Sequence, residues 1–148
     1  MSFWESLRIG SSGLSAQRLR LDLISNNIAN AQTTRTEKGG AYQRQDVVFA
    51  ADAKRSFASQ LISARRADVS NLQGGVKVAQ ITTDTTPGST VYDPTNPDAD
   101  ASGNVTYPNV DITVEMTNML SATRSYEANL ATIEAVKRMA LKALEIGR

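Results

Sequence analysis

Three oxygen-bearing residues in the middle of the chain have the spacing of half a calcium-binding loop. Asp98, Asp100 and Ser102 alternate with other residues, and Gly103 follows them. In an EF-hand loop this pattern supplies oxygen ligands, and the twelfth position must then provide a glutamate. Here the twelfth position is Asn109, and no helix is expected before the loop. We therefore interpret the stretch as a solvent-exposed turn, an interpretation that calorimetry with calcium can test.

The rest of the composition removes most other catalytic and binding chemistry. The 148 residues include no cysteine and no histidine, so disulfides, Cys/His zinc sites and histidine- or cysteine-based catalysis are excluded. Neither a Walker pattern nor a G-x-G-x-x-G pattern is present. Sixteen basic against fifteen acidic residues give a net charge of +1, which argues against a dedicated nucleic-acid binder. We therefore expect no cofactor, no metal and no catalytic residues, and predict that the protein is not an enzyme.

The chain shows no signal for membrane insertion or for a cleaved leader. Charged residues interrupt every apolar stretch before the roughly 20 residues that a membrane span needs. Glu5 and Arg8 come early and a Gly-Ser-rich stretch follows at 10–13, so the N-terminus does not read as a cleavable signal peptide. We therefore expect the protein to stay in the cytosol or to leave the cell by an export pathway that does not use a cleaved signal peptide.

Along its length, the chain divides into three segments. Residues 2–31 and 110–147 are predicted to be helices, and residues 32–109 are rich in Gly, Pro, Thr, Asp and Ser. The expected fold class is α+β, with long N- and C-terminal helices pairing as a coiled-coil layer and a small β-rich middle domain. Residues 50–73 are ambiguous, although their first part, 50–54, could be helical. Alternation and turn formers predict strands at 41–49, 76–81, 89–92 and 105–107.

Both predicted helices carry apolar residues that repeat every seven positions. Such a repeat lines one helix face and suits packing against a partner helix. We call this set the assembly seam. It comprises Leu7, Leu14, Leu21, Ile24 and Ile28 on the first helix, and Met119, Tyr126, Ile133, Val136 and Ala140 on the second.

Two features suggest that the seam is not closed within one chain. Aromatic residues make up only 5% of the sequence, which is low for a compact core of this length. The stretch Gly10-Ser11-Ser12-Gly13 is poor helix material, because glycine loses more backbone entropy and serine competes for backbone hydrogen bonds. The first turns of the N-terminal helix are therefore expected to be marginal in an isolated chain.

Asparagines gather at the end of the first helix, and this run carries the strongest local signal. Physically, it is a helix C-terminus that finishes in an Asn-rich turn. It also resembles the N-terminal signature of the flagellar basal-body rod and hook family, and a run in the second helix resembles the C-terminal signature of that family. The signature residues are Ser25, Asn26, Asn27, Ile28, Ala29 and Asn30 in the first run, and Ser125, Tyr126, Glu127, Ala128 and Asn129 in the second.

Segments of the middle part resemble the proximal-rod members of that family, and the resemblance covers nearly the whole chain. These segments are Thr33–Thr36, Gly39–Gln45, Val91–Pro94, Pro97–Asp100 and Pro108–Val110, and Met139–Glu145 in the second helix resembles the same members. The resemblance implies a structural subunit of the proximal rod that polymerises through its terminal helices into the axial drive shaft around an export channel. It also implies a periplasmic location in the basal body. The implied partners are further copies of this chain, the other rod proteins, and components of the rod base and membrane ring.

The resemblance further implies export through the flagellar type III apparatus without a cleaved signal. A chain that travels unfolded would benefit from termini that order only on assembly. Phe3 and Leu7 match a short hydrophobic pattern of early export substrates. They can equally be ordinary seam positions at i, i+4, and the two interpretations are compatible.

Two alternatives remain open at this stage. One is another rod or hook-family axial protein. The other is a soluble helical export chaperone or adaptor, which would form a discrete, well-folded dimer in isolation. The rod interpretation instead predicts disordered ends in the monomer, so circular dichroism with hydrogen exchange distinguishes the two.

Overall fold

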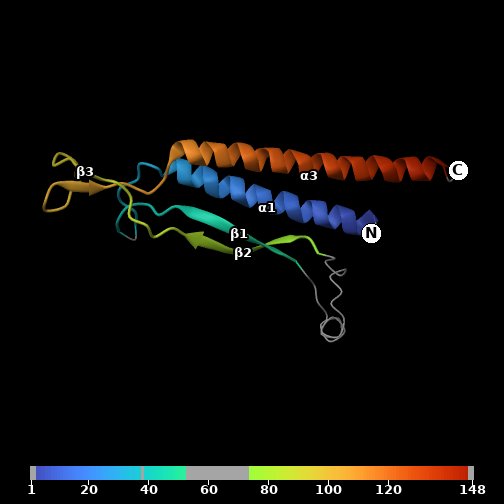
Figure 1. Ribbon diagram of the computed structural model, residues 1–148, viewed down its shortest axis with the longest axis horizontal. Coiled ribbons are helices and arrows are strands. Elements are labelled where there is room, and N and C mark those ends of the chain that lie inside the picture. Colours follow the sequence, from blue (N-terminus) through green and yellow to red (C-terminus); the bar gives the residue numbers. More distant parts are fainter. Residues whose placement is uncertain (1–2, 38, 53–73, 147–148) are drawn as a thin grey trace, which may run out of the picture. The chain divides into compact units, whose positions relative to one another are not determined.

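A computed structural model of the chain describes residues 3–37, 39–52 and 74–146, and it has an α+β fold (Figure 1). This confirms the predicted class of two long helices with a small β-rich middle. The residues so described form, in chain order, α1 (Phe3–Ala29), β1 (Gln45–Ala51), β2 (Val76–Thr83), β3 (Thr90–Tyr92), β4 (Asn104–Thr106) and α3 (Ile112–Ile146).

The two helices end within a few residues of the predicted limits, and side chains explain the ends. α1 stops at Ala29, where the Asn30 side-chain amide donates to the carbonyl of Asn26 at 2.9 Å, as expected for an Asn-rich turn. α3 begins after Asp111, whose Oδ1 accepts a hydrogen bond from the amide of Thr113 at 2.8 Å. Asp111 therefore acts as an N-cap for the longer helix.

The strands form two antiparallel pairs. β1 pairs with β2, and the backbone bonds from Asp52 N to Gly75 O and from Asp84 N to Arg44 O lie at opposite ends of the pair. β3 pairs with β4 in the register Thr90↔Thr106, Val91↔Val105 and Tyr92↔Asn104. All four strands overlap the predicted ones, with shifts of at most four residues at their ends.

The ambiguous segment 50–73 lies largely outside the described residues. Its first two residues, Ala50 and Ala51, complete strand β1, so the possible helix at 50–54 does not begin there. The register of β1 against β2 provides the physical reason. Asp52 N donates to Gly75 O at 2.7 Å, which extends the ladder past these alanines.

The chain folds as two compact units, and each unit takes part of both helices. Unit 1 consists of Met1–Arg18, Phe49–Ala79 and Arg124–Arg148. Unit 2 consists of Leu19–Val48 and Gln80–Thr123. The division into segments 2–31, 32–109 and 110–147 follows the order of elements along the chain, and as a division into domains it stays a prediction.

Buried side chains are distributed unevenly between the two units. Among the described residues, Ala16 is the one buried residue of unit 1. Unit 2 buries a mixed set of apolar and polar side chains, which includes Leu23, Ile24, Asn27, Val105, Glu115 and Ala122. Within the described part of the chain, neither helix combines the length and apolar character that a bilayer crossing requires.

Candidate assembly site

In unit 1, the glycines of the Gly10–Gly13 stretch let α3 approach α1 closely. A Cβ added at Gly10 would lie 2.7 Å from Cγ1 of Ile133, and one added at Gly13 would lie 3.0 Å from Nδ2 of Asn129. Residue numbers rise along α1 as they fall along α3, so the two helices run antiparallel here. The residues that weaken the helix by propensity are therefore those that make room for its partner.

Ser12, in the same stretch, binds strand β2 instead of α3. Its hydroxyl donates to the carbonyl of Ile9 at 2.7 Å and accepts from the amide of Val76 at 3.0 Å. A Cβ at Gly75 would collide with the Ser12 side chain, so a larger residue there would force Ser12 to move. This short stretch thus contacts two different elements, with Gly10 and Gly13 facing α3 and Ser12 facing β2.

In unit 2, the end of α1 is fixed by a buried polar group at Asn27. The Asn27 amide nitrogen donates to the carbonyl of Gln45 at 2.8 Å and to Oε2 of Glu115 at 3.1 Å. Its carbonyl oxygen accepts from the Tyr42 hydroxyl at 2.9 Å and from the amide of Gln45 at 3.0 Å. Both donors and both lone pairs of this fully buried side chain are used. Its burial therefore leaves no polar atom of the amide without a hydrogen-bond partner.

Arg44 completes this group by pairing with the carboxylate of Glu115. Its Nε and Nη2 lie 2.9 and 2.8 Å from Oε1 of Glu115, whose side chain is 1% exposed. Burial opposes the charge of Arg44, but the hydrogen bond to Glu115 and the charges of Glu115 and Asp46 outweigh it and raise the pKa of Arg44. We call Asn27, Tyr42, Arg44 and Glu115 the Asn27 cluster.

Tyr42 is held as a neutral donor within this cluster. Burial, followed by the nearby charge of Glu115, raises the pKa of the Tyr42 phenol above its ordinary value. The cluster links the end of α1, the start of β1 and the first turn of α3. It holds together parts of the chain that are up to 88 positions apart in the sequence.

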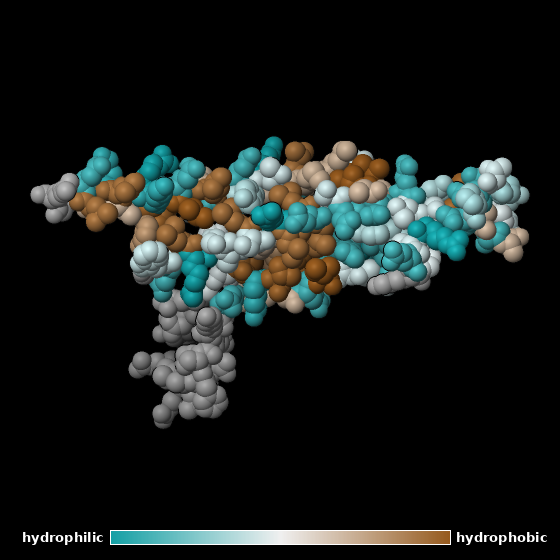
Figure 2. Space-filling view, turned by 180° about the vertical axis from the view of Figure 1, so that it is seen from behind, coloured by the Kyte–Doolittle hydropathy of each residue, from teal (hydrophilic) through white to brown (hydrophobic). Residues whose placement is uncertain are grey.

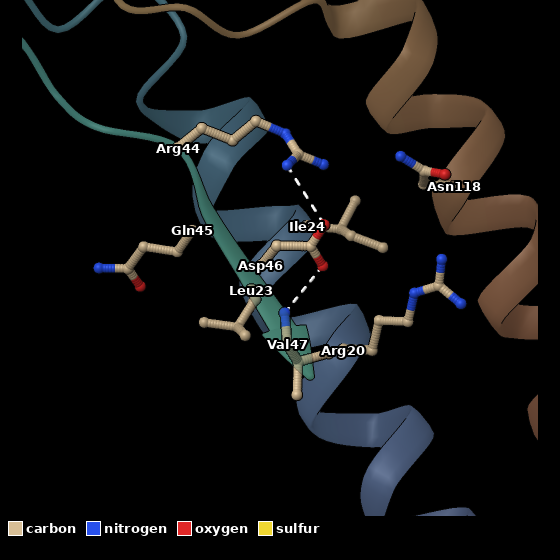
Figure 3. A pocket seen from close by; sticks show the side chains of 8 residues that line it. All are labelled: Arg20, Leu23, Ile24, Arg44, Gln45, Asp46, Val47 and Asn118. Carbon is tan, nitrogen blue, oxygen red and sulfur yellow. Dashed lines mark hydrogen bonds and ion pairs between the residues drawn. The ribbon is translucent and has the colours of Figure 1, made fainter. Parts of the chain in front are cut away.

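A small pocket of about 50 Å³ lies beside the cluster, between the end of α1 and β1 (Figure 3). The side chain of Arg44 reaches Asp46 at 3.2 Å, and Oδ1 of Asp46 accepts from the amide of Val47 at 2.7 Å. Arg20 and Asn118 stand across the opening from this strand. The pocket is far below the roughly 300 Å³ at which small-molecule sites begin, and its lining serves the packing of unit 2.

The predicted seam residues lie on the partly covered faces of the two helices. Ile24 is buried, whereas the other seam residues on both helices are half-buried. Ile133 is the one that faces Gly10. The other buried side chains on α1 belong to neighbouring positions outside the seam, Ala16, Leu23 and Asn27. The part that the seam residues play in assembly stays a prediction.

The signature residues divide into three kinds of environment. Asn27 belongs to the buried cluster, while Asn26 and Asn30 bond each other through their side chains at 2.9 Å at the helix end. Asn129 lies over Gly13. Ser125, Tyr126 and Ile28 are half-buried, and Ser25, Ala29, Glu127 and Ala128 are exposed.

The N-terminal pair proposed for export lies at the start of α1. The ring of Phe3 contacts that of Trp4 edge-on, with centroids 5.6 Å apart. Phe3 is partly exposed and Leu7 is half-buried. Both residues are helical in the folded chain, and their role in export stays a prediction.

The aspartates that resemble half a calcium loop are engaged in local turns. Oδ1 of Asp100 accepts from the amides of Ser102 and Asn104, and Oδ2 of Asp98 accepts from the hydroxyl of Thr34. Gly103 has φ +77°, a backbone conformation that favours glycine. Among the described residues no group of three or more acidic side chains is arranged to hold a metal ion.

Glu115 and Ser12 are the contact residues that the sequence pattern did not single out. Glu115 precedes Ala122, Asn129 and Val136 in steps of seven, so it is a charged residue on a row that faces α1. A charge at a covered heptad position is the signal that could have identified it. Ser12 gave no such signal, because its partner on β2 is remote in the sequence.

Large apolar side chains are also exposed on both helices, as Figure 2 illustrates for the C-terminal part of α3. In unit 1 the most exposed are Trp4 at 76%, Leu144 at 72% and Ile146 at 85%. In unit 2 the exposed residues on α3 are Ile112, Val114, Met116 and Leu120. Exposed apolar surface of this kind indicates contacts with other molecules.

Comparison with known proteins gives family matches at both ends of the chain. A family described as "Flagella basal body rod protein" matches residues 7–35. A second, described as "Flagellar basal body rod FlgEFG protein C-terminal", matches residues 101–146. The first match contains the Asn-rich run and the second contains Glu115 and the whole of α3.

Full-length relatives are similar along the whole chain. The flagellar basal-body rod protein FlgC of Bacillus subtilis is 42% identical over 152 aligned positions, covering 100% of both chains. The FlgC protein of Borreliella burgdorferi is 42% identical and covers 99% of this chain and 98% of its own. That of Salmonella typhimurium is 41% identical over 95% of this chain and 94% of its own.

Proposed function

The chain belongs to the flagellar basal-body rod protein family, and we propose that it polymerises through its terminal helices into the proximal rod around the export channel. It is a structural subunit of the flagellar basal body, not an enzyme. The relatives are rod proteins along their full length, which favours this function over that of an export chaperone or adaptor.

The observation that carries the polymer proposal is the unfinished burial of both long helices. Leu141, Leu144 and Ile146 near the end of α3 are each more than half exposed in a single chain. Burying apolar surface is worth about 25 cal/mol per Å², so exposed rows on long helices favour association with further helices. The half-buried seam residues supply the remaining apolar contacts between helices.

As a rod-family member, the protein assembles with other flagellar rod components. We further propose direct contacts with the components of the rod base and the membrane ring, and a periplasmic position for the finished rod. The same reasoning assigns transit through the type III export apparatus without a cleaved signal peptide, with Phe3 and Leu7 as the candidate export motif.

Replacing one half-buried seam residue by a charge tests the proposal. Leu21→Asp should abolish incorporation into rods and swimming, because a carboxylate would have to be buried unpaired between helices. The measurement is motility in a strain that lacks the native gene, with immunoblots to establish that the variant is made and exported.

Leu21→Met is the matched control, since a volume-conserving apolar exchange in packed surroundings is tolerated. It should restore motility. Normal swimming with Leu21→Asp would contradict the role of the seam.

A further inference from the structure

We propose that the Asn27 cluster sets the register of α1 against α3, selecting one antiparallel alignment among several that the apolar repeats allow. The inference rests on the proposed function in one respect only: the register decides which side chains face neighbouring subunits. The alignment itself is a property of the folded single chain.

The apolar repeats alone leave the alignment ambiguous. A shift of α1 by seven residues exchanges Leu7, Leu14 and Leu21 for one another. The same shift on α3 exchanges Met119, Tyr126 and Ile133, which are all apolar. Heptad seams are degenerate under such shifts, and proteins commonly use one buried polar residue to remove the degeneracy.

The polar contacts of unit 2 fit one alignment only. A seven-residue shift of α3 would bring Ala122 to the level of Glu115, and alanine offers no side-chain acceptor to Asn27 or Arg44. The same shift of α1 would bring Arg20 to the level of Asn27, and arginine cannot accept from Tyr42 and Gln45. Each alternative therefore leaves buried polar groups unpaired, which is strongly unfavourable.

Unit 1 favours a single alignment by a different mechanism, steric exclusion. Asn129 fits over Gly13 because no side chain stands there, and Ile133 fits over Gly10 for the same reason. A seven-residue shift of α1 would place Ser6 or Arg20 at the level of Gly13. Either side chain would crowd Asn129, whose Nδ2 lies 3.0 Å from the position of a Cβ at Gly13.

Pulsed electron paramagnetic resonance on the full-length chain measures the register directly. The protein has no cysteine, so spin labels at Asp22→Cys and Thr123→Cys are specific. Both positions are exposed and both lie in unit 2. A seven-residue shift moves one helix by about 10 Å along the other at about 1.5 Å per residue. The labelled parent should give one distance.

The decisive variant is Asn27→Leu combined with Glu115→Leu, which removes the polar contact between the two helices and leaves Arg44 with Asp46 as its ion-pair partner. We expect it to keep its helix content by circular dichroism and to show a second distance in at least about a tenth of the molecules. A single, unchanged distance in this folded variant would overturn the proposal.

Glu115→Gln provides a second test if the double variant does not fold. It keeps an acceptor for Asn27 but loses the charge that pairs with Arg44, so a smaller second population is expected. Glu127→Gln, an exposed change on the same helix, is the control and should keep one distance. One distance in Glu115→Gln as well would overturn the proposal. Because no rod is needed, failure here is distinguishable from failure of the proposed function, which the Leu21→Asp motility test addresses.

Discussion

Unit 2 satisfies its buried polar groups, whereas unit 1 does not. In unit 2 the amide of Asn27 uses all of its hydrogen-bonding positions and Glu115 is paired with Arg44. In unit 1 Oε1 of Gln17 is buried without a partner among the described residues, and Ala16 is the one buried residue there. The same two helices therefore have a finished core over one part of their length and an unfinished one over the other.

The difference indicates how one chain can be stable before assembly and completed by it. Unit 2 has the partners it needs for its polar groups and can hold the end of α1 against α3 by itself. Unit 1 relies on close backbone approach at Gly10 and Gly13 and leaves Trp4, Leu144 and Ile146 exposed. Local stability in a protein follows buried apolar contacts, so unit 1 is expected to open more readily than unit 2.

The largest effect is expected from removing the central carboxylate of unit 2. Glu115→Ala leaves one donor of the buried Asn27 amide unpaired and removes one of the two carboxylates that pair with Arg44, and breaking a buried ion pair costs up to about 3–5 kcal/mol. Urea unfolding followed by circular dichroism measures this loss. Glu145→Ala removes an exposed ion pair with Lys142 and should cost less than about 1 kcal/mol. Equal losses of unfolding free energy in Glu115→Ala and Glu145→Ala would contradict the view that unit 2 has a finished polar core and unit 1 does not.

Two glycine substitutions, one in each unit, sharpen the comparison. At Gly88 in unit 2, a Cβ would meet the backbone of Tyr107 and lie 2.6 Å from the carbonyl carbon of Pro108. Backbone cannot yield cheaply, so Gly88→Ala should lower the free energy of unfolding by about 1–3 kcal/mol.

At Gly75 in unit 1, the obstacle is the Ser12 side chain. Gly75→Ala should change the unfolding of the isolated chain little but reduce incorporation into rods.

Those two variants need only urea titrations and a motility assay. A large loss of stability from Gly75→Ala in the isolated chain, matching that from Gly88→Ala, would mean that unit 1 is already well packed alone.

A smaller effect is expected at alkaline pH and is confined to unit 2. The raised pKa of Tyr42 means that the folded chain favours the neutral phenol, so its contribution is fully present below the ordinary tyrosine pKa of about 10. The contribution is lost as the pH rises through the higher folded value. Tyr42→Phe should flatten this alkaline decline in thermal stability, whereas Tyr92→Phe, an exposed change, should leave it intact. If the alkaline decline were unaltered in Tyr42→Phe, ionisation of Tyr42 in the Asn27 cluster would not be its cause.

Much of the fold followed from local sequence patterns. Heptad repeats predicted both helices, and alternation with turn formers predicted the positions of all four described strands to within a few residues. These features depend on residues that are close together in the sequence, so the periodicity of apolar residues detects them. The Asn-rich run also predicted the end of α1, because asparagine side chains bond the nearby backbone.

The candidate site was less predictable, since its contacts join distant parts of the chain. Asn27 was singled out as part of a signature, but its partners Tyr42 and Glu115 lie 15 and 88 positions away. The Gly10–Gly13 stretch was interpreted only as weak helix. Its role in packing depends on which residues of α3 and β2 face it. Those contacts join residues far apart in the chain, so they cannot be inferred from local sequence patterns.

Hydrogen exchange along the two helices of the isolated full-length chain tests the central claim most directly. We predict strong protection of amides in the parts of α1 and α3 that belong to unit 2, 19–29 and 112–123, and rapid exchange in the parts that belong to unit 1. In assembled rods both parts should be protected. Equal, strong protection along the whole of both helices in dilute monomer would contradict the claim that assembly completes unit 1.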